Sequence, residues 1–252
     1  MKFAHFKPFY TFLGMNNLED TVDKLFHKSL EENIEPKLSL IPEVVVNKLN
    51  SAPHNYEILE DIDNFDYVFS LNNISELPGH DYKKQRNLVT TFLKKEPNYK
   101  FGLLNVHDPK IQQQVTSLCD IWYTNKINTS HPFEREREAI HRAIKNAIDF
   151  NLVCLGIWID DDLVAFSISE LLNDSKYVIA HYRKADISHY GIYQFFENQT
   201  ALYLRSLGAE FMNFEQDLGD EGLRKSKTLW RPVAFLKKYT ITPKEDIIHT
   251  LK

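Results

Sequence analysis

Apolar residues recur along this chain in two patterns, one typical of helices and one typical of strands. Apolar positions that return every three or four residues predict helices with one buried face. Such helices are expected over 18–30, 82–95, 109–126, 132–150, 191–207 and 222–229. Short runs rich in β-branched and aromatic residues predict strands. These runs cover 37–46, 67–71, 100–106, 153–159, 163–170, 176–182, 211–214 and 233–239.

The order of these elements is clearest from residue 100 onward, where it is β-α-α-β-β-β-α-β-α-β. Strands that alternate with helices in this way indicate an α/β protein of the α+β type, built on one mixed sheet. We expect the strand that contains Met212 to lie in one sheet with the strands at Ile157, Phe166 and Ile179. Residues before 100 are expected to form a smaller packed unit.

Composition narrows the class of protein. The chain has 252 residues, of which 43% are hydrophobic and 26% charged, as in a globular protein with a proper core. Cys119 and Cys154 lie far apart and outside any metal-binding spacing, which favours a reducing compartment and predicts a cytoplasmic location. The first ten residues are interrupted by charged residues and proline, so no signal peptide is indicated. No run is apolar enough for an integral membrane segment, and oligomeric state is open.

Charge is unevenly distributed along the chain. The net charge of −5 argues against bulk attraction to nucleic acid, but basic residues gather over 80–100 and 224–238. Lys83, Lys84 and Arg86 on the helix over 82–95 are therefore a candidate nucleic-acid or phosphate track. A solvated helix face is the alternative interpretation.

The densest chemistry lies in N-F-E-Q-D-L-G-D-E-G-L-R-K-S-K-T-L-W-R-P, residues 213–232. If a strand ends here, alternate residues point to one side, and glycines then permit a sharp turn into a helix. We predict Glu215 and Asp217 as catalytic carboxylates that accept a proton. The predicted substrate-binding residues are Asn213, Gly219, Gly222, Arg224, Lys227, Arg231, Lys184 and Asp186.

A structural interpretation of the same stretch stays open. Acids at a helix start and bases in its later turns are common, and Asp217 with Arg224 could form a structural ion pair. A site would present these charges in an open cleft, whereas a structural cluster would pair and cover them. His181, His189 and Tyr190 could line a cleft, but a histidine beside a strand end is more often a surface residue.

Four segments resemble a known family. They are E-L-P-G-H-D-Y-K-K-Q-R-N, R-K-A-D-I-S-H-Y-G-I-Y, N-F-E-Q-D-L-G-D-E-G-L-R-K-S-K and R-P-V-A-F-L-K-K-Y. From Leu71 to Tyr239 the chain resembles the family of the phosphatidylglycerol lysyltransferase C-terminal domain, whose members are similar to two GNAT-like acyltransferase halves in tandem. This resemblance implies a shortened N-terminal GNAT-like half over 1–97 and a C-terminal GNAT-like domain over 98–252.

The resemblance also implies a function. Lysyltransferases of this kind move an amino acid from aminoacyl-tRNA to a lipid head group. We therefore expect an acyl or aminoacyl transferase that acts on a small-molecule acceptor, with aminoacyl-tRNA as a candidate donor and direct attack in a ternary complex. The alternative is a non-catalytic GNAT-like module that binds a small amino-acid derivative or RNA.

Cofactors and metals are not expected. Ordinary GNAT enzymes hold the pyrophosphate of coenzyme A with a loop like [RQ]-x-x-G-x-[GA] before a helix. Here the run is S-H-Y-G-I-Y, in which only Gly191 fits, and the bulk of Tyr193 hinders close backbone approach. Coenzyme A is therefore disfavoured, although the loop does not rule it out. Glu138 and His141 have the E-x-x-H spacing, but such a metal site requires a second helix of the same kind.

Overall fold

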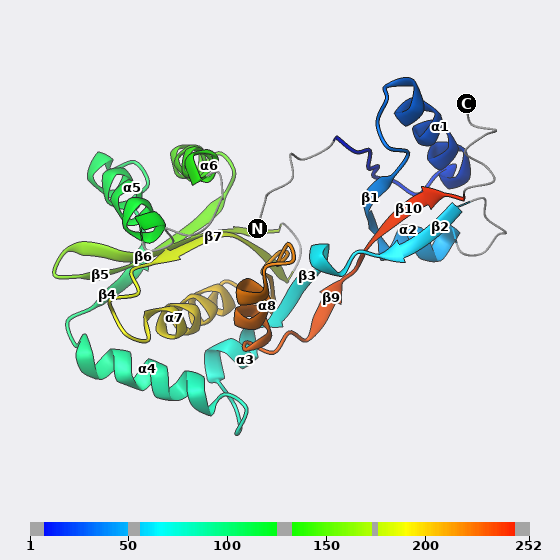
Figure 1. The fold of residues 1–252 in the computed structure, drawn as a ribbon. Coiled ribbons are helices and arrows are strands. Elements are labelled where there is room, and N and C mark those ends of the chain that lie inside the picture. Colours follow the sequence, from blue (N-terminus) through cyan, green and yellow to red (C-terminus); the bar gives the residue numbers. More distant parts are fainter. Residues whose placement is uncertain (1–7, 50–55, 125–132, 173–175, 245–252) are drawn as a thin grey trace. The chain divides into compact units, whose positions relative to one another are not determined.

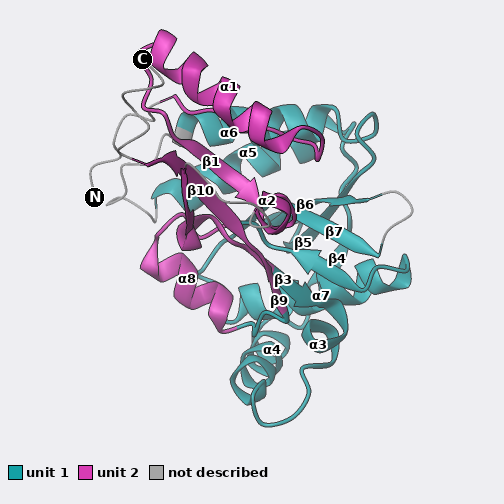
Figure 2. Ribbon diagram, turned by 90° about the vertical axis from the view of Figure 1, so that its right-hand side faces the viewer, with its two compact units in different colours: residues 1, 68–215, 230–233 teal, residues 2–67, 216–229, 234–252 magenta. Residues whose placement is uncertain are grey.

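The computed structural model describes residues 8–49, 56–124, 133–172 and 176–244. The chain divides into two compact units, shown in Figure 2. Unit 1 contains 68–215 and 230–233, and unit 2 contains 2–67, 216–229 and 234–252. The division of the family pattern at residue 97 stays a prediction. Residues 68–97 belong to unit 1.

Unit 1 is built on a mixed sheet. Its strands are β4 (Lys100–Leu103), β5 (Leu152–Ile159), β6 (Asp162–Leu171), β7 (Tyr177–Ala185) and β8 (Phe211–Asn213), together with the end of β3 (Asp66–Ser70). The strand order is β4-β5-β6-β7-β8-β3-β9, in which β9 (Ala234–Leu236) and the first residues of β3 belong to unit 2. Strands β7 and β8 are parallel, and the other registered neighbours are antiparallel. The prediction that Met212 shares a sheet with Ile157, Phe166 and Ile179 is confirmed.

Helices cover both faces of this sheet in unit 1 (Figure 1). Helices α5 (Pro109–Thr124) and α6 (Phe133–Lys145) enclose one core with Cys154 and Phe166. Helices α4 (Lys83–Lys95) and α7 (Ile192–Ser206) enclose the other with Leu155 and Ala165. Successive residues of β5 and β6 thus enter opposite cores, because side chains alternate along a strand. The short helix α3 (Leu71–Glu76) packs on α7.

Strands β7 and β8 pair over only part of their length. Strand β7 has nine residues, and its pairing with β8 joins Tyr177 to Phe211, Val178 to Met212 and Ile179 to Asn213. Beyond Ile179, β7 continues beside β6 as far as Ala185. Polar side chains at this point are therefore at the end of the parallel pairing, where ligands of open α/β sheets commonly bind.

Unit 2 has its own sheet and core. Its helices are α1 (Leu18–Glu31), α2 (Glu43–Leu49) and α8 (Glu221–Thr228), with a 3-10 turn, η1 (Ile62–Asn64). Strands β1 (Leu38–Pro42), β10 (Lys238–Pro243) and β2 (Tyr56–Glu60) form an antiparallel sheet in that order. Val22, Phe26, Ile41 and Ile241 are fully or almost fully buried in its core.

Most predicted elements are present, and the exceptions have local causes. The expected strand over 37–46 ends at Pro42, and its valines continue as α2, where Val45 and Val46 are buried in the core of unit 2. The expected single strand over 233–239 is two strands, β9 and β10, which belong to different sheets. Strand β2 and helix α3 had no sequence prediction.

Candidate functional site

A bulge in β7 determines the position of His181. Ile168 of β6 pairs with Tyr182, while the next residue, Ser169, pairs with Ala180. His181 is therefore an extra residue opposite β6, and it lies just beyond the pairing of β7 with β8. A bulge of this kind changes the direction of a side chain and is common beside active sites.

The imidazole of His181 lies between two carboxylates of unit 1. Its Nε2 is 3.0 Å from Oε2 of Glu170, on β6, and its Nδ1 is 3.4 Å from Oε1 of Glu215, just after β8. The side chains of His181, Glu170 and Glu215 are 29%, 40% and 41% exposed. The three groups are thus close enough to share a proton and open enough for a ligand to reach them.

The backbone of Glu215 is held in an unusual conformation. Its φ is 56°, a left-handed value that residues other than glycine seldom adopt. The N–H of Glu215 donates a hydrogen bond of 2.7 Å to Oδ1 of Asn213, which is buried. Asn213 therefore positions the catalytic candidate Glu215 through its backbone. Strained conformations that the surrounding structure enforces are concentrated at functional sites.

The two carboxylates change the acidity of His181. The hydrogen bond to Glu215 is the largest cause, and with the contact to Glu170 it raises the pKa of His181 above its usual value. Partial burial acts in the opposite direction but is outweighed. His181 is consequently a stronger base than an isolated histidine, because both neighbours stabilise its imidazolium form.

Arg183 and Phe214 support this group of residues from the adjacent positions. The guanidinium of Arg183 lies 3.7 Å from the ring centroid of Phe214 and forms an ion pair with the buried Glu197 of α7. Phe214 is itself buried and precedes Glu215. The start of the Glu215 turn is therefore packed against Arg183 of β7, which is itself anchored to α7.

Lys184 and Asp186, two predicted substrate-binding residues, have partners within unit 1. The buried ammonium of Lys184 lies 2.8 Å from Oε1 of Glu136 and 3.6 Å from the ring centroid of Trp122. Oδ1 of Asp186 accepts a hydrogen bond of 2.9 Å from the backbone N–H of Ser188, in the loop before α7. The charge of Lys184 is thus balanced by the protein, and Asp186 fixes a turn. Their predicted roles in substrate binding stay predictions.

The three residues of the predicted track on α4, Lys83, Lys84 and Arg86, have different surroundings. Lys83 and Lys84 line a surface pocket of unit 1 together with Arg231, a predicted substrate-binding residue. Arg86 instead donates from Nη1 to the backbone carbonyl of Leu77, which ends α3 in a left-handed conformation. Arg86 therefore satisfies a helix end, and the two lysines retain exposed side chains.

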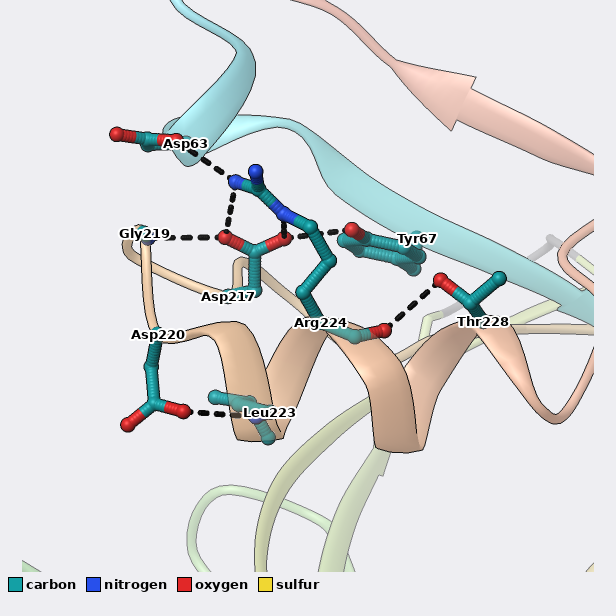
Figure 3. Close-up of polar contacts among 8 residues, drawn as sticks. All are labelled: Asp63, Tyr67, Asp217, Gly219, Asp220, Leu223, Arg224 and Thr228. Atoms are coloured by element: carbon teal, nitrogen blue, oxygen red, sulfur yellow. Dashed lines mark hydrogen bonds and ion pairs between the residues drawn. The ribbon is translucent and has the colours of Figure 1, made fainter.

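Asp217 and Arg224, in unit 2, are paired within one polar cluster (Figure 3). The Asp217 side chain is completely buried and accepts two hydrogen bonds of 2.8 Å from the guanidinium of Arg224. It also accepts from the Tyr67 hydroxyl at 2.5 Å and from the Gly219 N–H at 2.9 Å. Arg224 reaches Asp63 as well, at 2.7 Å. The charges are thus paired, as the structural interpretation requires, but only Asp217 is covered, because the side chains of Arg224 and Asp63 are 39% and 59% exposed.

The pKa of Asp217 agrees with a structural role. Burial alone would raise the pKa, but hydrogen bonds from Arg224, Tyr67 and Gly219 outweigh burial and hold it below the usual value of an aspartate. A carboxylate with four donated hydrogen bonds is a weak proton acceptor. The geometry thus favours Glu215 over Asp217 for proton transfer, although the predicted role of Asp217 is untested.

The remaining predicted residues of unit 2 lie just before α8 or within it. Gly219 has a φ of 75°, and an added Cβ would lie 3.0 Å from Asp63 Oδ2. Gly222 lies in the first turn of α8. Asp220 caps this helix by accepting a hydrogen bond of 2.8 Å from the N–H of Leu223. Lys227 is buried, with Nζ 5.7 Å from the ring centroid of Tyr67.

Sequence reasoning missed the central residue of the site in unit 1. The sequence leaves His181 open as a cleft-lining or a surface residue, with the surface favoured, and predicts no role for Glu170. A usable signal was present, because His181 interrupts the apolar run K-Y-V-I-A-H-Y. The bulge that directs its side chain depends on pairing with β6, and no residue type in β7 specifies that pairing.

The sequence matches the family model described as phosphatidylglycerol lysyltransferase, C-terminal, over residues 12–242. The chain therefore belongs to this family, as the resemblance predicted. None of the curated proteins compared with the sequence matches it.

Three solved structures have the same fold. A conserved protein of unknown function from Bacteroides thetaiotaomicron is 24% identical, with a TM-score of 0.81 over 96% of this chain and 81% of that one. The C-terminal domain of a putative lysylphosphatidylglycerol synthetase from Agrobacterium fabrum is 13% identical, with a TM-score of 0.64 over 92% and 75%. L-PGS from Bacillus licheniformis is 11% identical, with a TM-score of 0.61 over 91% and 75%.

These likenesses confirm the predicted fold class, a GNAT-like α/β protein. Family and fold together support a transferase of the acyl or aminoacyl kind. In the described part of the chain, no helix combines the length and the apolar character that crossing a membrane requires.

Proposed function

We propose that this protein transfers an aminoacyl group from aminoacyl-tRNA to the amine or hydroxyl of a small-molecule acceptor. The observation that supports the proposal best is the Glu170–His181–Glu215 group at the end of the β7–β8 pairing. It joins a predicted catalytic carboxylate, Glu215, to a histidine with a raised pKa. Such a pair provides the proton transfer that this reaction requires.

The reaction is a direct displacement. The acceptor nitrogen or oxygen attacks the carbonyl carbon of the aminoacyl ester, a new bond to that carbon forms, and the ester bond to the ribose oxygen breaks. The acceptor loses a proton to the exposed carboxylate of Glu215, which shares it with His181. The same pair returns a proton to the leaving ribose oxygen, so the protein is unchanged after turnover.

Each residue of the group has a distinct role. Glu170 stabilises the imidazolium form of His181 from β6, and Asn213 positions Glu215 through its backbone N–H. Both His181 nitrogens already contact carboxylates, so Glu215 provides the route by which a substrate proton reaches the ring.

The loop before α7 supports a donor other than coenzyme A. A Cβ at Gly191 would lie 2.4 Å from the backbone oxygen of Leu88, so this glycine permits close packing on α4. The need for glycine is thus explained without a bound pyrophosphate. The hydroxyl of Tyr193 accepts a hydrogen bond of 2.8 Å from the indole N–H of Trp122. This bond holds the Tyr193 ring in place two residues after Gly191.

We place the reaction in the cytoplasm, where the buried free thiols of Cys119 and Cys154 stay reduced.

The test is transfer from labelled aminoacyl-tRNA to a panel of small amines and hydroxyl compounds. Wild-type protein should form a labelled product, and Glu215→Gln and His181→Asn should each slow its formation by about 100-fold or more. Asp220→Asn, a change of a capping carboxylate in unit 2, is the control and should leave the rate unchanged. Equal rates for Glu215→Gln and wild type would contradict the assigned role.

A non-catalytic binding module is the second candidate. The observation that favours it is the ion pair of the buried Asp217 with Arg224, since a binding scaffold needs a carboxylate paired in this way only for its own stability. On this reading, the protein binds an aminoacyl compound or RNA and forms no product. Saturable binding without turnover across the panel would select this candidate.

A further inference from the structure

A pocket of about 510 Å³ lies at the start of α4 in unit 1. Its volume falls in the usual range of small-molecule sites. Three cationic side chains and one acidic side chain line it, from the loop before α4, the first turn of α4 and residue 231. The pocket is therefore basic, although the whole chain has a net charge of −5.

Two lysines of this pocket have charges available to a ligand. Lys83 and Lys84 are exposed, and among the described residues no carboxylate lies within ion-pair distance of either ammonium. Arg231 adds a guanidinium that is half exposed and 3.3 Å from Asp81. The Tyr82 hydroxyl donates 3.1 Å to the carbonyl of Trp230, which ties this segment to α4. The three cations are thus held around one space.

An aromatic ring forms another wall of the pocket. The side chain of Tyr190 is 55% exposed and lies with Leu88 and Thr91 in the lining. Its loop is fixed on both sides. His189 Nδ1 is 2.8 Å from Glu96 Oε1, and Gly191 packs against the backbone of Leu88. The ring itself contacts Lys95, whose Nζ lies 5.2 Å from the ring centroid. A planar ligand can therefore stack on an exposed ring whose loop is already ordered, which limits the entropy lost on binding.

We propose that this pocket binds a nucleotide, with the phosphate on Lys83, Lys84 and Arg231 and the base stacked on Tyr190. A phosphate alone would use the cations but not the ring, and a lipid head group has no planar ring to stack. The nucleotide is either a free nucleoside phosphate or the end of an RNA strand. The proposal is independent of the transfer reaction, because none of these side chains belongs to the Glu170–His181–Glu215 group.

Calorimetry with adenosine monophosphate, adenosine and inorganic phosphate at low salt tests the two halves of the pocket. We expect the monophosphate to bind at least about tenfold more tightly than either of the other two, because it makes both kinds of contact. A monophosphate that shows no saturable binding, or binds no better than phosphate, would overturn the proposal.

Variants separate the phosphate contacts from the ring. Lys83→Ala combined with Lys84→Ala should weaken monophosphate binding by about tenfold or more and reduce its salt dependence. Lys94→Ala removes an exposed lysine from the same helix but outside the pocket, and should change affinity less than about twofold. Tyr190→Leu should weaken the monophosphate by about tenfold but leave phosphate binding unchanged. An equal effect of the pocket and control lysines would contradict a defined site.

A further comparison identifies the source of the nucleotide. If the natural ligand is RNA, a single-stranded oligonucleotide that ends in C-C-A should bind at least about tenfold more tightly than the monophosphate, because it adds phosphate contacts. If the ligand is a free nucleotide, the oligonucleotide should bind no more tightly. Both results retain the site, whereas oligonucleotide binding that ignores the Lys83 and Lys84 changes would remove it.

Discussion

Replacement of Asp217 by asparagine tests the structural reading of the cluster in unit 2. The carboxylate is completely buried, and both of its oxygens accept hydrogen bonds from Arg224. An asparagine there has one acceptor oxygen and one NH₂ group, so one guanidinium N–H faces another donor whichever way the amide turns. The Tyr67 hydroxyl can accept a hydrogen bond from the amide instead of donating one, but the Arg224 guanidinium can only donate.

The size of the effect follows from these contacts. The substitution removes one hydrogen bond to a charged group and also the negative charge that balances the Arg224 guanidinium. Together these losses should destabilise unit 2 by about 3 kcal/mol. For a unit of the size of unit 2 that corresponds to a fall in its Tm of roughly 12 to 24 °C. Asp220→Asn is the matched control, because asparagine caps a helix as well as aspartate does.

Calorimetry is the suitable assay. All three tryptophans, Trp122, Trp158 and Trp230, lie in unit 1, so tryptophan fluorescence would follow the wrong unit. The low pKa of Asp217 adds a second signature. Its stabilising effect should be complete above about pH 4, the usual unfolded value, and decline as pH falls through the lower folded pKa. A Tm for Asp217→Asn within about 1 °C of both wild type and Asp220→Asn would refute the reasoning.

Three further predictions concern unit 1. Because the pKa of His181 is raised, its contacts stabilise the fold below about pH 6.5 and lose that effect as pH rises through the folded pKa. The difference in Tm between wild type and His181→Asn should therefore shrink from pH 6 to pH 9. In denaturant unfolding, Gly191→Ala should lower stability by roughly 3 kcal/mol, because φ at this position is 87° and the added Cβ would meet the Leu88 backbone. Gly208→Ala is the control and should cost about 1 kcal/mol, because φ there is 93° but the space around it is open. Acetyl-coenzyme A should bind with a Kd on the order of a millimolar or poorer, and micromolar binding by calorimetry would favour an ordinary acetyltransferase.

The sheet of unit 1 could be predicted well because apolar residues recur in each of its strands and helices with the spacing typical of that element. Strands β5, β6 and β7 and helices α5 and α7 lie within a few residues of their predicted ranges. The predictions were wrong where local preference and packing disagree. Valines 44–46 favour a strand by residue type, yet two of them are buried as part of α2.

The candidate site was harder to predict for a different reason. Residues 213–232 are contiguous in sequence, but they divide between two units, with Asn213, Glu215 and Arg231 in unit 1 and Asp217 and Arg224 in unit 2. The true neighbours of Glu215 include His181, which a register shift between β6 and β7 brings to it. Sequence spacing gives no information on such long-range contacts.

The most direct test of the proposed function is the pH dependence of single-turnover transfer from aminoacyl-tRNA by wild type and Glu215→Gln. Wild-type transfer should rise with pH as His181, whose pKa is raised, loses its proton, since the protonated ring cannot take up a proton that the acceptor gives to Glu215. Glu215→Gln should transfer about 100-fold more slowly or worse, with its binding of tRNA unchanged. Transfer by Glu215→Gln at the wild-type rate and with the wild-type pH profile would contradict the account.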